Sequence, residues 1–264
     1  MKSTSRITVA LLFLVPATAS AACTPSPPPL SWTTATEPTP ASVPIDPKTI
    51  GPLVVVMFRH AEKPIRDDGV MIEDGNLGSE AAGRLSRLPD ALLNRFGCPD
   101  LLIAANPAVK MINKATGQYF NYVRPLATIA PLSARINFPV WTPYGYNQNE
   151  SLAHDLLGDR AFAPDVNGKA KTVFIAWERN NIRKLYEQLV RLGNLRELAG
   201  NALAVEGEEY KCELPSKWLQ CDFDSIWLVH VRNGAICLTH RSENLDDMNF
   251  QSRCKGAESV TDAP

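Results

Sequence analysis

An uninterrupted apolar run that ends in a charged cluster is the feature of this sequence that most restricts its fold. Residues 53–58 read Leu-Val-Val-Val-Met-Phe, and Arg59 and His60 follow them directly. Apolar residues without polar alternation are typical of a strand covered on both faces, as in a parallel sheet flanked by helices. Pro64 prevents this strand from continuing much further. Since ligands of such sheets bind beyond the carboxyl ends of the strands, we expect Arg59 and His60 to lie at a binding crevice.

The chemistry of these two side chains suits phosphate groups. The guanidinium of Arg59 presents N–H donors in a planar fork that matches phosphate or carboxylate. The imidazole of His60 can act as a base, an acid or a nucleophile. An Arg-His pair also occurs at strand ends by chance, so the dipeptide alone leaves both interpretations open.

Length, charge and spacing exclude several classes of function. A chain of 264 residues can bury one substantial core. With 27 basic and 28 acidic residues it has almost no net charge to attract nucleic acid or an anionic membrane, and we expect neither as a partner. No apolar stretch is long enough for a transmembrane helix. Zinc-binding spacings such as C-x-x-C are absent as well, so we expect no metal and no cofactor.

The first residues have the pattern of an export signal. Lys2 and Arg6 give a positively charged start, residues 7–15 are almost entirely apolar, and small residues follow. We therefore expect an exported protein, periplasmic or secreted. A lipid anchor on Cys23 is the less favoured alternative, because Ser20 stands where a lipoprotein signal has an aliphatic residue.

Composition divides the remaining chain. The stretch after the signal is rich in proline and threonine and has little to bury, so we expect a flexible leader. The far C-terminus is polar and is expected to form a tail. The predicted division is a signal peptide at 1–22, a leader at 23–49, one domain at 50–245 and a tail at 246–264.

Six cysteines in an exported chain favour disulfides over metal or redox sites. Cys212 and Cys221 flank a short loop, and we expect them to pair. A second bridge is expected between Cys237 and Cys254, around the last strand. The sequence leaves open whether the two remaining cysteines, Cys23 and Cys98, pair.

The order of the other segments predicts an α/β fold. Apolar strands alternate with stretches whose leucines recur at helical spacing, and Asn233-Gly234 between two late strands is a strong hairpin signal. Since strand–helix–strand units form parallel sheets covered on both faces, we expect a three-layer sandwich with a mainly parallel central sheet. The expected strands are 53–58, 100–105, 171–177, 222–231 and 234–240, and the expected helices begin near residues 79, 124, 150 and 178.

Other segments receive simpler predictions. Residues 65–78 are expected to form a surface loop beside the crevice. Residues 193–221 are expected to be helical and then irregular, without chemistry. Arg84 and Arg87 are expected to be solvated charges of the first helix. His230 is expected to be a packed or edge histidine.

Three motifs occur in order along the chain: Arg59-His-Ala-Glu-Lys-Pro64, Arg124-Pro-Leu-Ala-Thr128 and Trp177-Glu178. They resemble those of the histidine phosphatase superfamily, of the phosphoglycerate mutase-like, branch 1 type. The strand that runs into Arg-His-Ala-Glu-Lys-Pro at 59–64 resembles the opening motif, usually Arg-His-Gly-Glu, whose histidine carries the phosphoryl group. Arg124-Pro-Leu-Ala-Thr128 resembles the second phosphate motif, in which an arginine precedes a threonine by four residues. Trp177-Glu178 resembles the end of a later strand, after which the family has a second catalytic histidine; this chain has Arg179 instead.

The resemblance implies an exported phosphomonoester hydrolase that acts on a small phosphorylated substrate without a metal. It implies that His60 is the nucleophile and that Arg59 and Arg124 hold the phosphoryl oxygens. Glu150 is the candidate acid that protonates the leaving group, although a carboxylate at the start of a helix is an equally good interpretation. Further contacts with the substrate are expected from Arg179 and from Glu62, for which a simple turn carboxylate is the alternative.

Arg179 also supports a rival hypothesis. With a pKa above about 12, an arginine stabilises negative charge but does not exchange protons near neutrality. The chain is then a weak or inactive family member that binds a phosphorylated or other anionic ligand. A third possibility, a purely interacting protein of the cell envelope, would be favoured if Arg59 and Arg124 lay far apart.

Overall fold

The structure is a computed structural model, and it describes residues 23, 45–158, 168–205 and 207–245. The strands are β1 (Leu53–Arg59), β2 (Leu101–Ala104), β3 (Lys110–Ile112), β4 (Tyr119–Asn121), β5 (Val140–Trp141), β6 (Lys171–Trp177), β7 (Arg196–Glu197), β8 (Ala202–Val205), β9 (Glu208–Lys211), β10 (Ser225–Arg232) and β11 (Ala235–Ser242). The helices are α1 (Ala82–Phe96), preceded by a 3₁₀ turn at Ser79–Ala81, α2 (Arg124–Ile136), α3 (Asn149–Gly158) and α4 (Arg179–Leu192).

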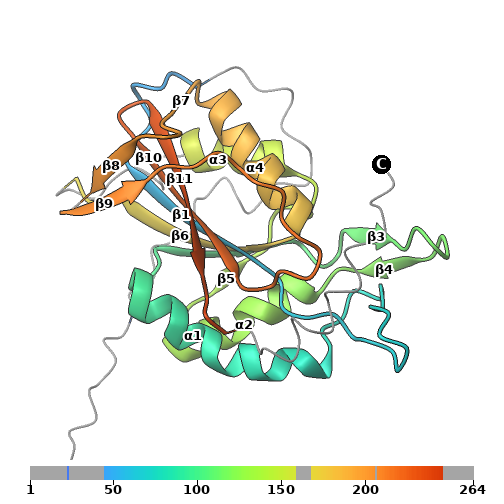
Figure 1. Ribbon diagram of the computed structural model, residues 1–264. Coiled ribbons are helices and arrows are strands. Elements are labelled where there is room, and N and C mark those ends of the chain that lie inside the picture. Colours follow the sequence, from blue (N-terminus) through green and yellow to red (C-terminus); the bar gives the residue numbers. More distant parts are fainter. Residues whose placement is uncertain (1–22, 24–44, 159–167, 206, 246–264) are drawn as a thin grey trace, which may run out of the picture.

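The described residues form three layers around a seven-stranded sheet with the order β5-β2-β6-β1-β10-β11-β7. Helices α1 and α2 cover one face, and α3 and α4 cover the other (Figure 1). Strands β1, β6, β2 and β5 are parallel to one another. Strand β10 pairs antiparallel with both β1 and β11. The predicted α/β sandwich with a mainly parallel central sheet is therefore confirmed.

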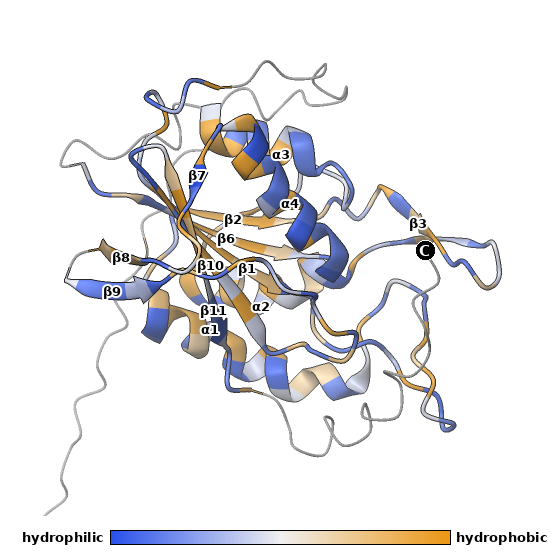
Figure 2. Cartoon of the chain, turned by 45° about the horizontal axis from the view of Figure 1, so that its top comes forward, coloured by the Kyte–Doolittle hydropathy of each residue, from blue (hydrophilic) through white to orange (hydrophobic). Residues whose placement is uncertain are grey.

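The core explains why β1 shows no polar alternation. Val55 and Met57 pack toward α3 and α4, while Val56 and Phe58 pack toward α1 and α2. Figure 2 shows the same division, with hydrophobic central strands between helices whose outer surfaces are hydrophilic. A strand that is buried on both faces has no solvent side on which a polar residue is favoured.

The sheet brings two charged strand ends side by side. In the parallel pair of β1 and β6, Arg59 lies opposite Trp177, and the His60 amide donates to the Trp177 carbonyl at 3.1 Å. Helix α4 begins directly after β6, because the Glu178 carboxylate accepts the first amides of the helix. Arg59 and Arg179 are thus delivered to the same edge of the sheet.

The Asn233-Gly234 hairpin is confirmed. Both residues have positive φ, 52° and 68°, as a two-residue turn between twisted antiparallel strands requires. The prediction for residues 193–221 was wrong, because this stretch contains strands β7, β8 and β9. Strand β8 is a short run of four residues, and the polar residues of β9 hide the apolar alternation by which strands are recognised.

The disulfides correct the predicted pairing. Cys212 bonds to Cys237, not to Cys221, because an antiparallel bridge between Glu213 and Leu238 places them on adjacent backbones. This bond also rules out the expected pairing of Cys237 with Cys254, which itself lies outside the described residues.

The second disulfide joins Cys23 to Cys98. While in this bond, the Cys23 sulfur cannot also carry a lipid thioether. Two disulfides are compatible with an exported protein, although export remains a prediction. The predicted signal peptide, most of the leader and the tail lie outside the described residues.

No helix in the described ranges is both long and apolar enough to span a bilayer.

Candidate active site

The site is built around His60, which is only 2% exposed at the end of β1. Its Nδ1 lies 2.7 Å from the carbonyl oxygen of Ala61. A carbonyl oxygen only accepts hydrogen bonds, so Nδ1 must carry the ring proton. This assignment leaves the lone pair on Nε2. The rings of Tyr122 and Phe223 flank the imidazole edge-on, with centroids at 5.8 and 6.0 Å.

Burial keeps this imidazole uncharged. It lowers the pKa of His60 well below the usual value, and the positive charges of Arg59, Arg124 and Lys63 lower that pKa further. The hydrogen bond to Ala61 opposes these effects only in part. His60 is therefore an uncharged imidazole at neutral pH, surrounded by cations.

Thr128 connects the first two sequence motifs. Its hydroxyl donates to the Arg124 carbonyl at 2.8 Å, one helical turn earlier in α2. The same oxygen accepts the Ala61 amide at 2.8 Å. The spacing of four between Arg124 and Thr128 thus has a physical reason, because one hydroxyl fixes the turn that carries His60 to the helix that carries Arg124.

Arg59, the last residue of β1, has no ion pair among its described contacts. Its Nη1 donates to the carbonyl oxygens of Gln220 and Asp222 at 2.5 and 2.9 Å, and its Cζ lies 3.8 Å from the centre of the Phe223 ring. Burial and the charge of Arg179 lower its pKa to about 10. Within the described residues, its buried Nε has no hydrogen-bond partner.

Arg124 is the first residue of α2 and is held by the loop that precedes α1. It donates from Nε to the Asn76 carbonyl at 2.8 Å and from Nη2 to the Ile72 carbonyl at 3.0 Å. Its Nη1 lies 3.1 Å from Glu73 Oε2. The loop at 65–78 therefore does more than border the crevice, because it orients one of the cations.

Lys63 is the residue that sequence reasoning missed. Although it stands in the opening motif, no role was assigned to it. Its Nζ forms an ion pair with Glu73, the carboxylate that also binds Arg124. Burial and the charge of Arg59 lower the pKa of Lys63 to about 8. The available signal was its position three residues after His60, in the same turn.

The three predicted guanidinium groups lie at one edge of the sheet. Arg59 and Arg124 both act electrostatically on His60, and Arg179 acts on Arg59. Arg179 donates to the Trp218 carbonyl at 3.3 Å, so it occupies the side of the site nearer to β10. The separation of Arg59 and Arg124 that would favour a mere interaction domain is not observed.

Glu150 has a different neighbour from the one we expected. Its Oε1 lies 2.8 Å from Nη2 of Arg191, and its side chain is 46% exposed. Arg191 belongs to the last turn of α4, whereas the site lies at the first turn of that helix. The role of Glu150 as the proton donor stays a prediction, and this ion pair does not favour it.

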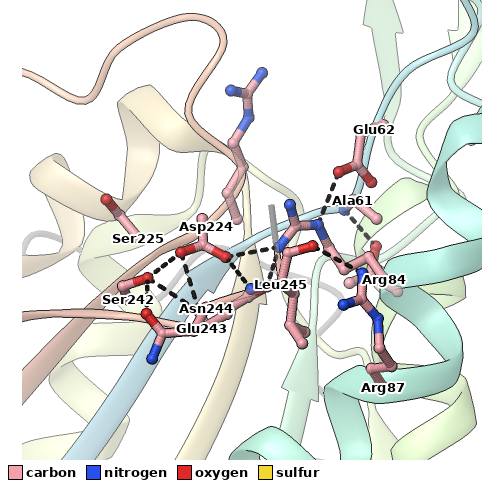
Figure 3. A network of polar contacts seen from close by, with 12 residues as sticks. Ala61, Glu62, Arg84, Arg87, Asp224, Ser225, Ser242, Glu243, Asn244 and Leu245 are labelled. Atoms are coloured by element: carbon pink, nitrogen blue, oxygen red, sulfur yellow. Dashed lines mark hydrogen bonds and ion pairs between the residues drawn. The ribbon is translucent and has the colours of Figure 1, made fainter. Parts of the chain in front are cut away.

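Glu62 binds a buried arginine, as Figure 3 shows. Its Oε1 accepts from Nε of Arg84 at 2.9 Å. Arg84 Nη1 also contacts Glu243 and lies 3.4 Å from Asp224 Oδ1. The prediction that Arg84 is a solvated helix charge was wrong, because the end of β11 covers it and leaves it 2% exposed. Through Arg84, Glu62 ties the His60 turn to the C-terminal end of the domain.

A metal site has no support in the described part of the chain, where no cluster of three or more His, Cys, Asp or Glu side chains could hold an ion.

Comparisons with known proteins give only distant structural likenesses. No protein-family model matches the chain, and no curated protein matches it in sequence. Among solved structures, it resembles a mycobacterial glucosyl-3-phosphoglycerate phosphatase, with a TM-score of 0.40 and 10% identity over 74% of this chain and 100% of that one. A phosphoglycerate mutase from Plasmodium falciparum gives 0.39 and 11% over 80% and 98%. Likenesses this distant carry no argument about activity, which has to come from the site.

The Arg84 network generates a prediction about stability and pH. Burial raises the pKa of Glu243 to about 8 in the folded protein. In the unfolded chain the group ionises near its ordinary pKa, so the folded state binds this proton more tightly. The free energy of unfolding therefore falls as the pH rises from about 4.5 to about 8, by about 1 kcal/mol per pH unit from this group alone.

Glu243→Gln is expected to remove this contribution, because glutamine keeps the shape but has no proton to lose. Urea unfolding at pH 5, 6.5 and 8 measures the slope. Glu187→Gln, which removes an exposed carboxylate paired with Arg183, should keep the parental slope. A parental slope in Glu243→Gln would mean that Glu243 is ionised in the folded protein.

Proposed function

We propose that this protein is a histidine phosphatase-like phosphomonoester hydrolase that acts on a small phosphorylated substrate through a phosphohistidine on His60. One observation carries the proposal. His60 is a neutral imidazole whose Nδ1 is held by a carbonyl, and the charges around it are those of Arg59, Arg124 and Lys63. A nucleophile with a fixed lone pair and surrounding positive charge is suited to attack on a phosphate dianion.

The chemistry proceeds in two steps. Nε2 of His60 attacks phosphorus in line, an N–P bond forms, and the P–O bond to the leaving group breaks. Arg59 and Arg124 hold the non-bridging oxygens, and the positive charge that develops on the ring is stabilised by the Nδ1–H bond to Ala61. Water then attacks the phosphohistidine, releases phosphate and regenerates the neutral imidazole.

The leaving oxygen needs a proton. A guanidinium does not exchange protons near neutrality, so Arg179 can contribute charge but not this proton. The positive charge of Lys63 lowers the pKa of His60. Because Lys63 itself has a pKa of about 8, it carries a proton at neutral pH. Lys63 is the donor that this geometry favours over Glu150, whose carboxylate pairs with Arg191.

Substitution of His60 tests the proposal directly. His60→Ala is expected to lower hydrolysis of p-nitrophenyl phosphate by about a thousandfold or more, because no other group replaces the nucleophile. His154→Ala, in a partly exposed position on α3, serves as the matched control and should retain activity. A base-quenched reaction should contain phosphohistidine only when His60 is present. Equal rates in His60→Ala and the parent would rule out His60 as the nucleophile.

Anion binding is expected to take up protons at pH 8. With a pKa of about 8, Lys63 is half protonated in the free protein at that pH. The negative charge of a bound sulfate raises this pKa, and we expect uptake of about half a proton per sulfate. Titration calorimetry in buffers of different ionisation enthalpy measures the number of protons taken up per bound sulfate.

Lys63→Met is expected to bind sulfate several-fold more weakly and without this uptake. Lys114→Gln, an exposed lysine in the turn between β3 and β4, should behave as the parent does. Equal uptake by Lys63→Met and the parent would assign the proton to another group.

The second candidate function is that of a weak or inactive family member that binds a phosphorylated or other anionic ligand. Arg179, in place of a second histidine, favours it. Arg179→His distinguishes the two. If the missing proton-exchanging group limits turnover, this variant should hydrolyse p-nitrophenyl phosphate several-fold faster than the parent. If the parent shows no turnover and the variant gains none while sulfate still binds, the protein is a binder.

A further inference from the structure

A cavity lies at the opposite end of the sheet from His60. Its volume is about 380 Å³, within the range of pockets that hold small ligands. It opens between the end of α1, the first residues of β1 and β6, and the β8–β9 ribbon, which Figure 1 places far from the β3–β4 hairpin. Its lining residues include Val54, Arg95, Phe96, Lys169, Leu228 and His230.

His230 is the unusual residue of this cavity. It is 5% exposed, and its Nε2 is buried without a hydrogen-bond partner in the described part of the chain. Its ring lies 4.4 Å from that of Tyr210, centroid to centroid. Burial lowers the pKa of His230 to about 4, so the ring is neutral. A buried polar atom without a partner costs free energy that an apolar side chain would avoid.

The charges at the rim favour an anion. Arg95 and Lys169 are exposed lining residues, and the positive charge of Arg241 also reaches His230. Glu208 is the only carboxylate among the described lining residues, and it accepts the Tyr210 hydroxyl at 2.7 Å. Among the described lining residues, basic side chains therefore outnumber carboxylates.

The walls between rim and histidine are apolar. Val54, Phe96 and Leu228 contribute to the hydrophobic cluster beneath α1 and α2 and also line the cavity. The lining therefore combines cationic side chains, apolar side chains and one buried, neutral imidazole.

We propose that this cavity binds a small amphipathic anion with a second polar group. The acidic group lies between Arg95 and Lys169, the apolar body packs on Phe96 and Leu228, and the second polar group forms a hydrogen bond with Nε2 of His230. A hydroxyaryl carboxylate has this chemistry, and 3-(4-hydroxyphenyl)propionate serves as the probe.

The test compares matched probes with the full mature protein. The chain has four histidines, so their imidazole ¹⁵N resonances can be followed individually. Titration with 3-(4-hydroxyphenyl)propionate should shift the ¹⁵N resonances of the His230 ring in a saturable way. The resonances of His154 and His240 should not shift. The parent should bind 3-phenylpropionate, which lacks the hydroxyl, about tenfold more weakly. A neutral analogue, 4-(3-hydroxypropyl)phenol, should also bind several-fold more weakly.

Two variants assign the contacts. In His230→Leu the hydroxyl group of the probe should no longer increase its affinity. 3-(4-hydroxyphenyl)propionate and 3-phenylpropionate should therefore bind this variant equally tightly. In Lys169→Gln both should bind several-fold more weakly, and the preference for the hydroxylated probe should persist. Lys114→Gln is the matched control. Retained hydrolysis of p-nitrophenyl phosphate, or retained sulfate binding, shows that each variant is folded, because both residues lie away from His60.

Three results would overturn the proposal. One is that His230 shows no saturable shift. Another is that the hydroxyl preference survives in His230→Leu. The third is that only His60 responds, which would place the carboxylate at the cations of the candidate active site.

Discussion

The peptide unit around Ala61 is the contact on which the site depends. The Ala61 carbonyl accepts a hydrogen bond from Nδ1 of His60, and the Ala61 amide donates one to the hydroxyl of Thr128. One residue therefore fixes the tautomer of the imidazole and also the distance between β1 and α2. Because Thr128 is bonded to the Arg124 carbonyl, the position of Arg124 depends on the same contact.

Positive charge at this place is costly for the folded protein. Arg59 and Lys63 have lowered pKa values chiefly because they are buried, and each also suffers from other cations nearby. Glu73 offsets part of this repulsion by binding both Lys63 and Arg124. An arrangement that is only partly neutralised favours an incoming anion, since the ligand relieves a repulsion that already exists.

The features predictable from the sequence were those encoded locally. The apolar run of β1 requires burial on both faces, Asn233-Gly234 requires a tight turn, and the spacing of Arg124 and Thr128 reflects one turn of helix. The burial of Arg84 could not be predicted, because its partners Asp224 and Glu243 lie 140 and 159 positions away in the sequence. The Cys212–Cys237 bond escaped for the same reason, since the β-bridge that aligns the two backbones has no local signal. Lys63 lay within a quoted motif, but its importance appears only when Glu73 and Arg124 converge on it.

The Arg84 network has a consequence for the life of the nascent chain. Strand β1 pairs with β10, Arg59 rests on carbonyls at 220 and 222, and the turn after His60 is tied through Arg84 to Glu243. A ribosome must therefore translate almost the whole domain before the contacts around His60 can form. Until then the contacts that orient Arg59 and Arg84 are missing, so a partly made chain has no assembled anion site.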